Sequence, residues 1–172
     1  MYNFDFHLAT NIHFGRGSVT SSLVKELGHG KNVFFVYDEV PVKASGLYDE
    51  IISALKAAGV RYQEFTGVEP NPRHTTVNRG IAALKEFNAD CIVAAGGGST
   101  LDCAKAISFG VYHDGDVWDF YSGRVPVEKV MPVIAIPTLA ASGAEVSFSA
   151  VISNMGTRQK IGLRNEKIRP TC

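Results

Sequence analysis

A run of three glycines, Gly96-Gly97-Gly98, is followed by Ser99 and stands between an apolar, β-branched stretch (residues 91–95) and a segment of helical periodicity (residues 100–109). Glycines at such a strand-to-helix junction let the backbone turn sharply and approach a ligand closely. The N-terminus of the following helix offers free N–H groups and a positive dipole end. The block therefore predicts a diphosphate site. A second interpretation, compatible with the first, is that Ser99 and Asp102 form a capping box and the glycines only make a tight turn.

The order of the motif differs from the ordinary dinucleotide fingerprint, which places G-x-G-x-x-G after the first strand and an acidic residue about 20 positions later. Here the acidic residue comes first, because Asp38 ends the predicted strand 33–37. The carboxyl ends of parallel strands meet at one edge of a sheet, so Asp38 could bind the adenosine ribose while residues 96–99 hold the diphosphate. A carboxylate there would repel the 2′-phosphate of NADP, which favours NAD. Alternatively, Asp38 caps a helix or turn.

Other polar residues are expected at the same edge. Asn71 lies between Pro70 and Pro72, which stiffen its backbone for an amide contact to a ribose or adenine, although asparagine is also a common turn former. Small hydroxyl side chains follow the predicted strand 133–136 and would suit the ribose and amide of a nicotinamide, or a plain loop. They are Thr138, Ser142, Ser147 and Ser149.

No other catalytic or metal-binding pattern is evident. The five histidines do not pair at i,i+4 on a predicted helix, so the chain is expected to hold no metal. It has neither a G-x-S-x-G elbow nor a G-x-x-x-x-G-K-[ST] loop, and no catalytic residue is assigned. Cys91, Cys103 and Cys172 show no framework spacing and are expected to be reduced thiols of a cytoplasmic protein.

Apolar strand-like runs alternate with segments of helical period, which predicts an α/β fold: a Rossmann-like, mostly parallel sheet with flanking helices. The two opening stretches, FDFHLA and NIHFG, predict a small N-terminal β-hairpin, and residues 146–152 and 157–163 a second one. Residues 111–123 predict an irregular, aromatic surface loop. The expected strands are 33–37, 61–67, 91–95 and 133–136, and the expected helices are 18–28, 46–58, 74–87 and 100–109.

Composition excludes several classes of partner. Seventeen basic residues balance seventeen acidic ones, so no net charge favours nucleic acid or an anionic membrane. No apolar run reaches the roughly 18 residues of a membrane span. Residues 1–17 show no secretory signal pattern, and a cytoplasmic location is expected. The 172 residues fit one domain.

Together these motifs resemble the iron-containing alcohol dehydrogenase family, in particular its butanol and propanediol dehydrogenase-like members. The resemblance covers essentially the whole chain, in order. It rests on Ile12-His13-Phe14-Gly15-Arg16-Gly17, Tyr37-Asp38, Val68-Glu69-Pro70-Asn71-Pro72, the block 96–105 (G-G-G-S-x-x-D-x-A-K), Pro137-Thr138 and Ser142-Gly143-Ala144-Glu145.

The resemblance implies an oxidoreductase that transfers a hydride between a primary alcohol or aldehyde and NAD(H), with NADP less favoured. It places Asp38 at the adenosine ribose, Asn71 near the adenosine, and Gly97, Gly98 and Ser99 at the diphosphate. It also places Asp102 near the nicotinamide and Lys160 at the nucleotide. The hydroxyl residues that it places along the inner half of the cofactor are Thr138, Ser142, Ser147 and Ser149. All the residues named in this paragraph, together with Gly96, form the predicted cofactor site.

The family binds Fe(II) or Zn(II) through one aspartate and three histidines of a helical C-terminal domain, and that ligand set is absent here. Residues 1–172 are therefore expected to be the NAD(P)-binding half, inactive alone, with apolar surface that could promote a homodimer. The chain also departs from the family at Leu139, which replaces a hydroxyl residue. Alternatives are a dehydroquinate-synthase-like or glycerol dehydrogenase-like enzyme on the same platform, or a non-catalytic nucleotide-binding module.

Overall fold

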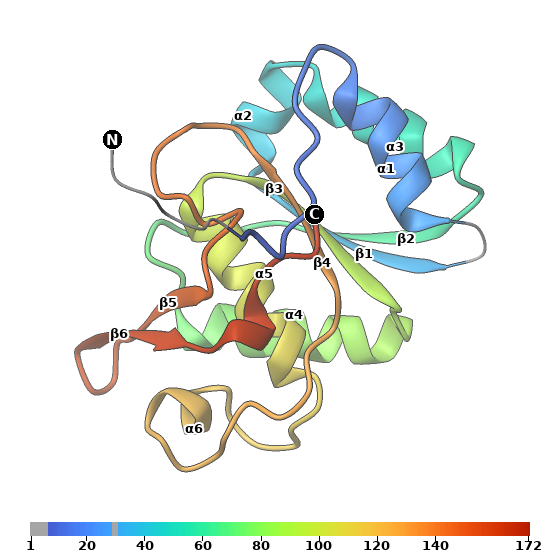
Figure 1. Cartoon of the computed structure of the whole chain (residues 1–172). Coiled ribbons are helices and arrows are strands. Elements are labelled where there is room, and N and C mark those ends of the chain that lie inside the picture. Colours follow the sequence, from blue (N-terminus) through green and yellow to red (C-terminus); the bar gives the residue numbers. More distant parts are fainter. Residues whose placement is uncertain (1–6, 29–30) are drawn as a thin grey trace, which may run out of the picture.

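Four parallel strands form the central sheet of the computed structural model, which describes residues 7–28 and 31–172 (Figure 1). The spatial order of the strands is β2-β1-β3-β4. This arrangement confirms the predicted α/β class. The strands are β1 (Asn32–Tyr37), β2 (Arg61–Phe65), β3 (Cys91–Gly96) and β4 (Val133–Pro137).

Helices cover both faces of the sheet (Figure 1). One face carries α1 (Ser18–Leu27), α2 (Glu39–Ala44) and α3 (Leu47–Ala57). The other carries α4 (His74–Phe87) and α5 (Gly98–Gly110). Strand β1 shows why both faces are covered: Phe34 and Val36 pack with α4 and α5, while Phe35 and Tyr37 pack with the other helices. Successive side chains of a strand point to opposite faces, so a run that is apolar throughout must be buried on both.

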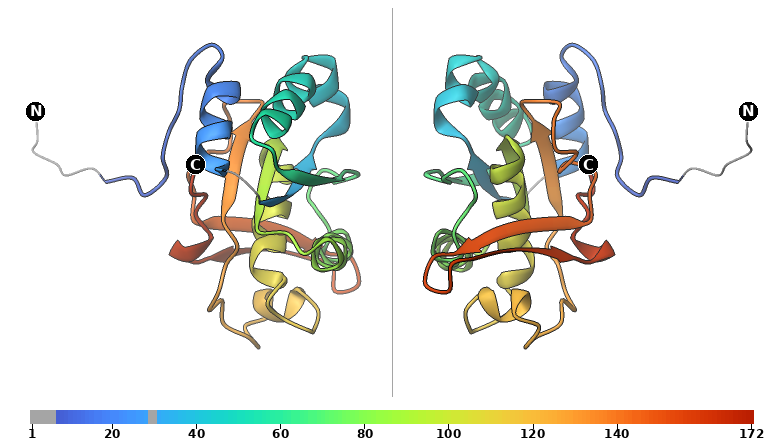
Figure 2. Two further views of the ribbon diagram at one scale, coloured as in Figure 1. Left: turned by 90° about the vertical axis from the view of Figure 1, so that its right-hand side faces the viewer. Right: turned by 90° about the vertical axis from the view of Figure 1, so that its left-hand side faces the viewer.

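Helix α5 is enclosed on nearly all sides, and ten of its thirteen residues are buried. It packs against the sheet, against α4 and against an antiparallel hairpin formed by β5 (Ser149–Asn154) and β6 (Gln159–Arg164). The hairpin crosses the side of α5 that faces away from the sheet (Figure 2). Close packing with α4 requires Gly80, where a Cβ atom would lie 2.4 Å from Ile107 Cδ1. The position of the N-terminus of α5 is therefore fixed by its surroundings.

The outer edge of β4 is covered by the two ends of the described chain. Thr171 N–H donates to Val133 O at 2.9 Å, and Ala135 N–H donates to Cys172 O at 2.7 Å. Asn11 N–H then donates to Thr171 O at 3.0 Å, so a second segment lies alongside the first. These bonds satisfy backbone groups that an edge strand would otherwise leave unpaired.

Several sequence expectations need correction. Half of the first predicted strand of the N-terminal hairpin, residues 4–6, lies outside the described residues, and residues 7–17 contain no strand. Residues 111–123 are not a surface loop, because they include α6 (Trp118–Tyr121), whose Trp118, Phe120 and Tyr121 are buried against α5. The short helix α2 and a 3-10 turn, η1 (Glu166–Ile168), were not foreseen.

No helix in the described part of the chain is both long enough and apolar enough to span a bilayer.

Candidate functional site

The carboxyl ends of β1 and β3 lie at the switch point of the sheet. The two strands are neighbours, but the chain leaves β1 toward the helices of one face and leaves β3 toward α5 on the other. Ligands of open α/β sheets bind outside the strand ends at such a point. Asp38 N–H donates to Ala95 O at 3.0 Å, which places Asp38 beside the glycine block.

The three glycines occupy different surroundings. A Cβ atom on Gly96 would lie 2.8 Å from Thr100 Cβ, and one on Gly98 would lie 2.6 Å from Ser142 Oγ. A side chain at Gly96 would meet the Cβ atom of buried Thr100, whereas one at Gly98 would displace only the exposed hydroxyl of Ser142. No described atom lies within 4 Å of the corresponding position on Gly97. The surface at Gly97 is open, and a ligand can approach its backbone.

The predicted capping box is not formed. Helix α5 begins at Gly98, its N-cap is Gly97, and no side chain caps it. Ser99 Oγ instead accepts from Asn71 N–H at 3.2 Å, and Asp102 Oδ2 accepts from Val151 N–H at 3.0 Å. The capping interpretation was wrong because the helix starts one residue before Ser99. Uncapped first-turn N–H groups of a helix are available to an anion.

The Asn71 turn comes together with α5 and β6. Asn71 has a positive φ of 57°, and its side-chain oxygen accepts a hydrogen bond from Lys160 Nζ. The turn is held by Glu69, whose carboxylate accepts from Arg73 N–H at 3.1 Å and from Thr76 Oγ1 at 2.9 Å. Three predicted site residues from separate elements, Asn71, Ser99 and Lys160, are thus brought together.

A buried lysine organises the segment that follows β4. Lys105 is fully buried, and its Nζ donates to Ala144 O and Ser149 O, both at 2.7 Å, and to Ser147 Oγ at 3.2 Å. The same ammonium lies 3.5 Å from Asp102 Oδ1. Burial lowers the pKa of Lys105 and raises the pKa of Asp102, because it disfavours the charged form of each.

Sequence reasoning assigned no role to Lys105, although it is one of only two charged residues on α5, three positions after Asp102. The lysine positions residues 142–149, which contain three of the predicted hydroxyl residues. Ser142 is exposed, with its Oγ against Gly98, whereas the Ser147 hydroxyl bonds within the protein.

The remaining predicted positions lie at the strand ends. Asp38 is the N-cap residue of α2, yet its side chain makes no cap hydrogen bond, so capping does not account for the carboxylate. Thr138 is exposed, and its N–H donates to Gly96 O at 3.1 Å. The structure thus lines up Asp38, the glycine block and Thr138 along one edge of the sheet.

A cavity of about 830 Å³ lies next to this edge, between residues 10–23 and residues 134–146. Its walls are mainly apolar, including Ile12, Leu23 and Ile136. It contains neither Asp38 nor the glycine block, and it shares only Thr138 with the predicted nucleotide site. The predicted nucleotide site therefore lies outside this cavity, at the switch point of the sheet.

The metal implied by the family resemblance does not fit the residues present. Within residues 7–28 and 31–172, the one group of three or more side chains able to hold an ion is His13, Glu26 and Cys172. One histidine, one glutamate and one cysteine do not match an aspartate and three histidines. No chemical step is therefore assigned to that metal.

The three thiols differ in exposure and should therefore differ in reactivity. Cys91 and Cys103 are buried, whereas Cys172 is partly exposed. Burial raises the pKa of Cys91 to about 11 and that of Cys103 further. In folded, chelator-treated protein at neutral pH, we expect a thiol reagent to modify Cys172 first and the other two only after denaturant is added. Peptide mass spectrometry after timed labelling measures this, and rapid labelling of Cys91 or Cys103 would contradict the described core.

Comparison with known proteins agrees with this geometry. The model of the iron-containing alcohol dehydrogenase family matches residues 9–172. The chain is 41% identical over 170 residues to NADH-dependent butanol dehydrogenase A of Clostridium acetobutylicum, and 44% identical over 171 residues to a probable NADH-dependent butanol dehydrogenase of Bacillus subtilis. Each match covers 99% of this chain and 44% of the relative, so the chain spans less than half the length of these relatives.

A solved structure shows the same fold. The crystal structure of NADH-dependent butanol dehydrogenase A from Thermotoga maritima superposes with a TM-score of 0.91 at 35% sequence identity. The superposition covers 99% of this chain and 43% of that one.

Proposed function

The chain belongs to the iron-containing alcohol dehydrogenase family, and we propose that it forms the NAD-binding domain of an enzyme that transfers a hydride between a primary alcohol or aldehyde and NAD(H). The observation that carries this proposal is the open backbone at Gly97, next to the first turn of α5 and across the switch point from Asp38. When bound, the nicotinamide supplies the hydride acceptor.

The residues of the chain bind and orient the cofactor. The backbone at Gly97 and the first turn of α5 face the diphosphate, where N–H donors and the helix dipole stabilise negative charge. Asp38 accepts hydrogen bonds from the adenosine ribose. Asn71 and Lys160, which are already bonded to each other, contact the adenosine side. Thr138 and Ser142 line the nicotinamide side.

The relatives support the choice of cofactor, since two of them are described as NADH-dependent. A small-molecule alcohol or aldehyde is the proposed substrate, and a cytoplasmic location and a homodimer are proposed with it. The balanced charge of the chain gives no support to a nucleic-acid partner.

Replacing Asp38 with serine tests the cofactor choice. Losing a hydrogen bond to a charged group costs about 1.5–3 kcal/mol, so we expect NADH affinity to fall about tenfold or more. NADPH affinity should rise, because the repulsion of its 2′-phosphate is removed. Energy transfer from Trp118, the one tryptophan, to the reduced nicotinamide reports binding.

Asp49→Ser is the matched control, because Asp49 is an exposed carboxylate on α3 that is not among the residues proposed to bind the cofactor. It should leave both affinities unchanged. Tighter binding of NADPH than NADH by the unaltered chain would overturn the role of Asp38.

A further inference from the structure

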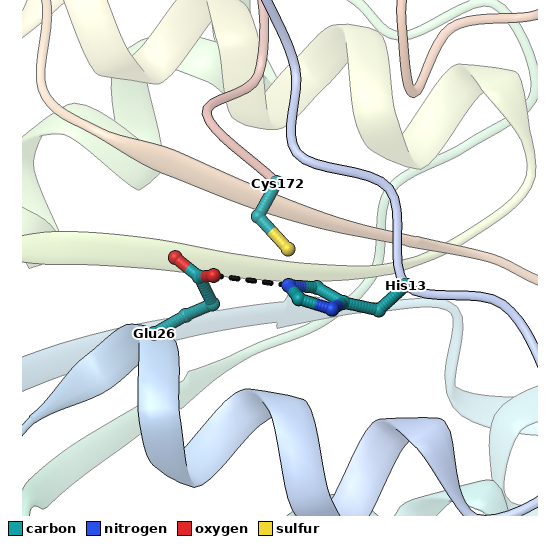
Figure 3. A group of neighbouring side chains, drawn as sticks. All are labelled: His13, Glu26 and Cys172. Atoms are coloured by element: carbon teal, nitrogen blue, oxygen red, sulfur yellow. Dashed lines mark hydrogen bonds and ion pairs between the residues drawn. The ribbon is translucent and has the colours of Figure 1, made fainter.

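Three side chains from distant parts of the sequence converge beside β4 (Figure 3). They are His13, which precedes α1, Glu26 in the last turn of α1, and Cys172. One potential ligand atom from each lies within 4.8 Å of those of the other two, and His13 Nε2 is 3.0 Å from Glu26 Oε1. The spacing of these residues in the sequence could not reveal the group.

The backbone already holds the three positions. Cys172 O accepts from Ala135 N–H, and the segment of His13 is joined to that of Cys172 by the bond from Asn11 N–H to Thr171 O. Glu26 is carried by α1, whose Leu23 and Leu27 are buried in the core. A ligand at this point would therefore meet a largely preformed set of donors.

The donor set matches a particular class of cation. Imidazole, thiolate and carboxylate are the ligands of Zn²⁺ and similar transition ions, whereas Mg²⁺ and Ca²⁺ prefer oxygen ligands alone. A neutral imidazole with two anionic ligands also balances a divalent charge. The hydrogen bond between His13 and Glu26 by itself accounts for two of the side chains but leaves the thiol of Cys172 unexplained.

The cavity beside β4 supplies room for a further ligand. His13 and Cys172 both line the cavity of about 830 Å³, whose other walls are mainly apolar. A four-coordinate zinc site with three protein ligands keeps one position for water or another small ligand. Here that position would face the cavity.

We propose that His13, Glu26 and Cys172 bind one divalent cation of the zinc class, with an open coordination position toward the cavity. This site is separate from the nucleotide site and from the aspartate–histidine metal site implied by the family. A bound cation would link the segment before α1, α1 itself and the segment beside β4.

Cobalt titration of the reduced, metal-free chain tests the proposal. Co²⁺ bound by a thiolate gives a charge-transfer absorption that oxygen and nitrogen ligands alone do not give. We expect this band to saturate at one Co²⁺ per chain and to disappear when Zn²⁺ is added. Zn²⁺ should also raise the melting temperature, because three segments become linked.

Variants separate this site from adventitious binding. Cys172→Ser should abolish the charge-transfer band, and His13→Asn and Glu26→Gln should each weaken binding about tenfold or more. His7→Asn, which changes an exposed histidine outside the group, is the matched control and should bind as the unaltered chain does. Melting temperatures of the metal-free variants show that they fold. Absence of the band in the unaltered chain, or its persistence in Cys172→Ser, would overturn the proposal.

Discussion

Replacing Gly97 with valine should weaken dinucleotide binding about a hundredfold while the protein remains folded. The added Cβ atom would lie in the space that is open at Gly97, so we expect the valine side chain to meet the diphosphate of the cofactor. The backbone there has φ −77° and ψ 179°, which valine adopts readily. Loss of two charge-assisted hydrogen bonds would cost about 3 kcal/mol or more, which corresponds to a loss of affinity of about a hundredfold.

NADH titration and thermal unfolding together measure this result. Gly97→Ala should show an intermediate loss of affinity, because its side chain is smaller. Gly96→Ala serves as the contrast: its Cβ would lie 2.8 Å from Thr100 Cβ, so we expect it to lower the melting temperature. Undiminished NADH binding by Gly97→Val would place the diphosphate elsewhere.

Replacing Lys105 with methionine should destabilise the protein by about 3 kcal/mol, because a buried charge would lose its partner and buried carbonyl groups would lose their donor. The groups left behind are Ala144 O, Ser149 O and the carboxylate of Asp102. The segment 142–149 would also lose its anchor on α5, so NADH affinity should fall as well. Urea denaturation gives the free energy of unfolding.

Two further variants make this result interpretable. Lys56→Met, at an exposed position of α3, should change stability by no more than about 0.5 kcal/mol. Asp102→Asn combined with Lys105→Met should be less destabilising than the sum of the single changes, because the two residues interact. Additive effects would show that the pair is not coupled as the structure indicates.

The main elements of the fold were predictable because their local signals agree with their tertiary surroundings. Helix α4 begins and ends at the predicted residues, 74 and 87, and residues 33–37 of β1 are apolar because they are buried on both faces. Helix α2 was missed because it is only six residues long and contains Pro41, a residue typical of turns. The short turns before and after β4 carry no periodic pattern of apolar residues, so their structure could not be predicted from the sequence.

Features of the site that depend on tertiary contacts could not be predicted. The glycine block signals a ligand, but only the packing of Thr100 and Ser142 distinguishes Gly96 and Gly98 from Gly97. Similarly, the S-x-x-D pattern of Ser99 and Asp102 is typical of a capping box, yet both side chains bond to segments remote in sequence. Residues 111–123 were expected to form an irregular surface loop, because sequence alone does not show that α6 packs against α5.

The most direct test of the nucleotide site is an NMR titration of the isotopically labelled chain with NAD⁺. We expect the amide signals of Asp38, Asn71, Gly97 and Ser99 to shift together. Those of Val19 and Leu23, in the cavity beside β4, should stay unchanged. Shifts confined to the residues of that cavity, or no shifts at all at saturating NAD⁺, would contradict a cofactor site at the switch point of the sheet.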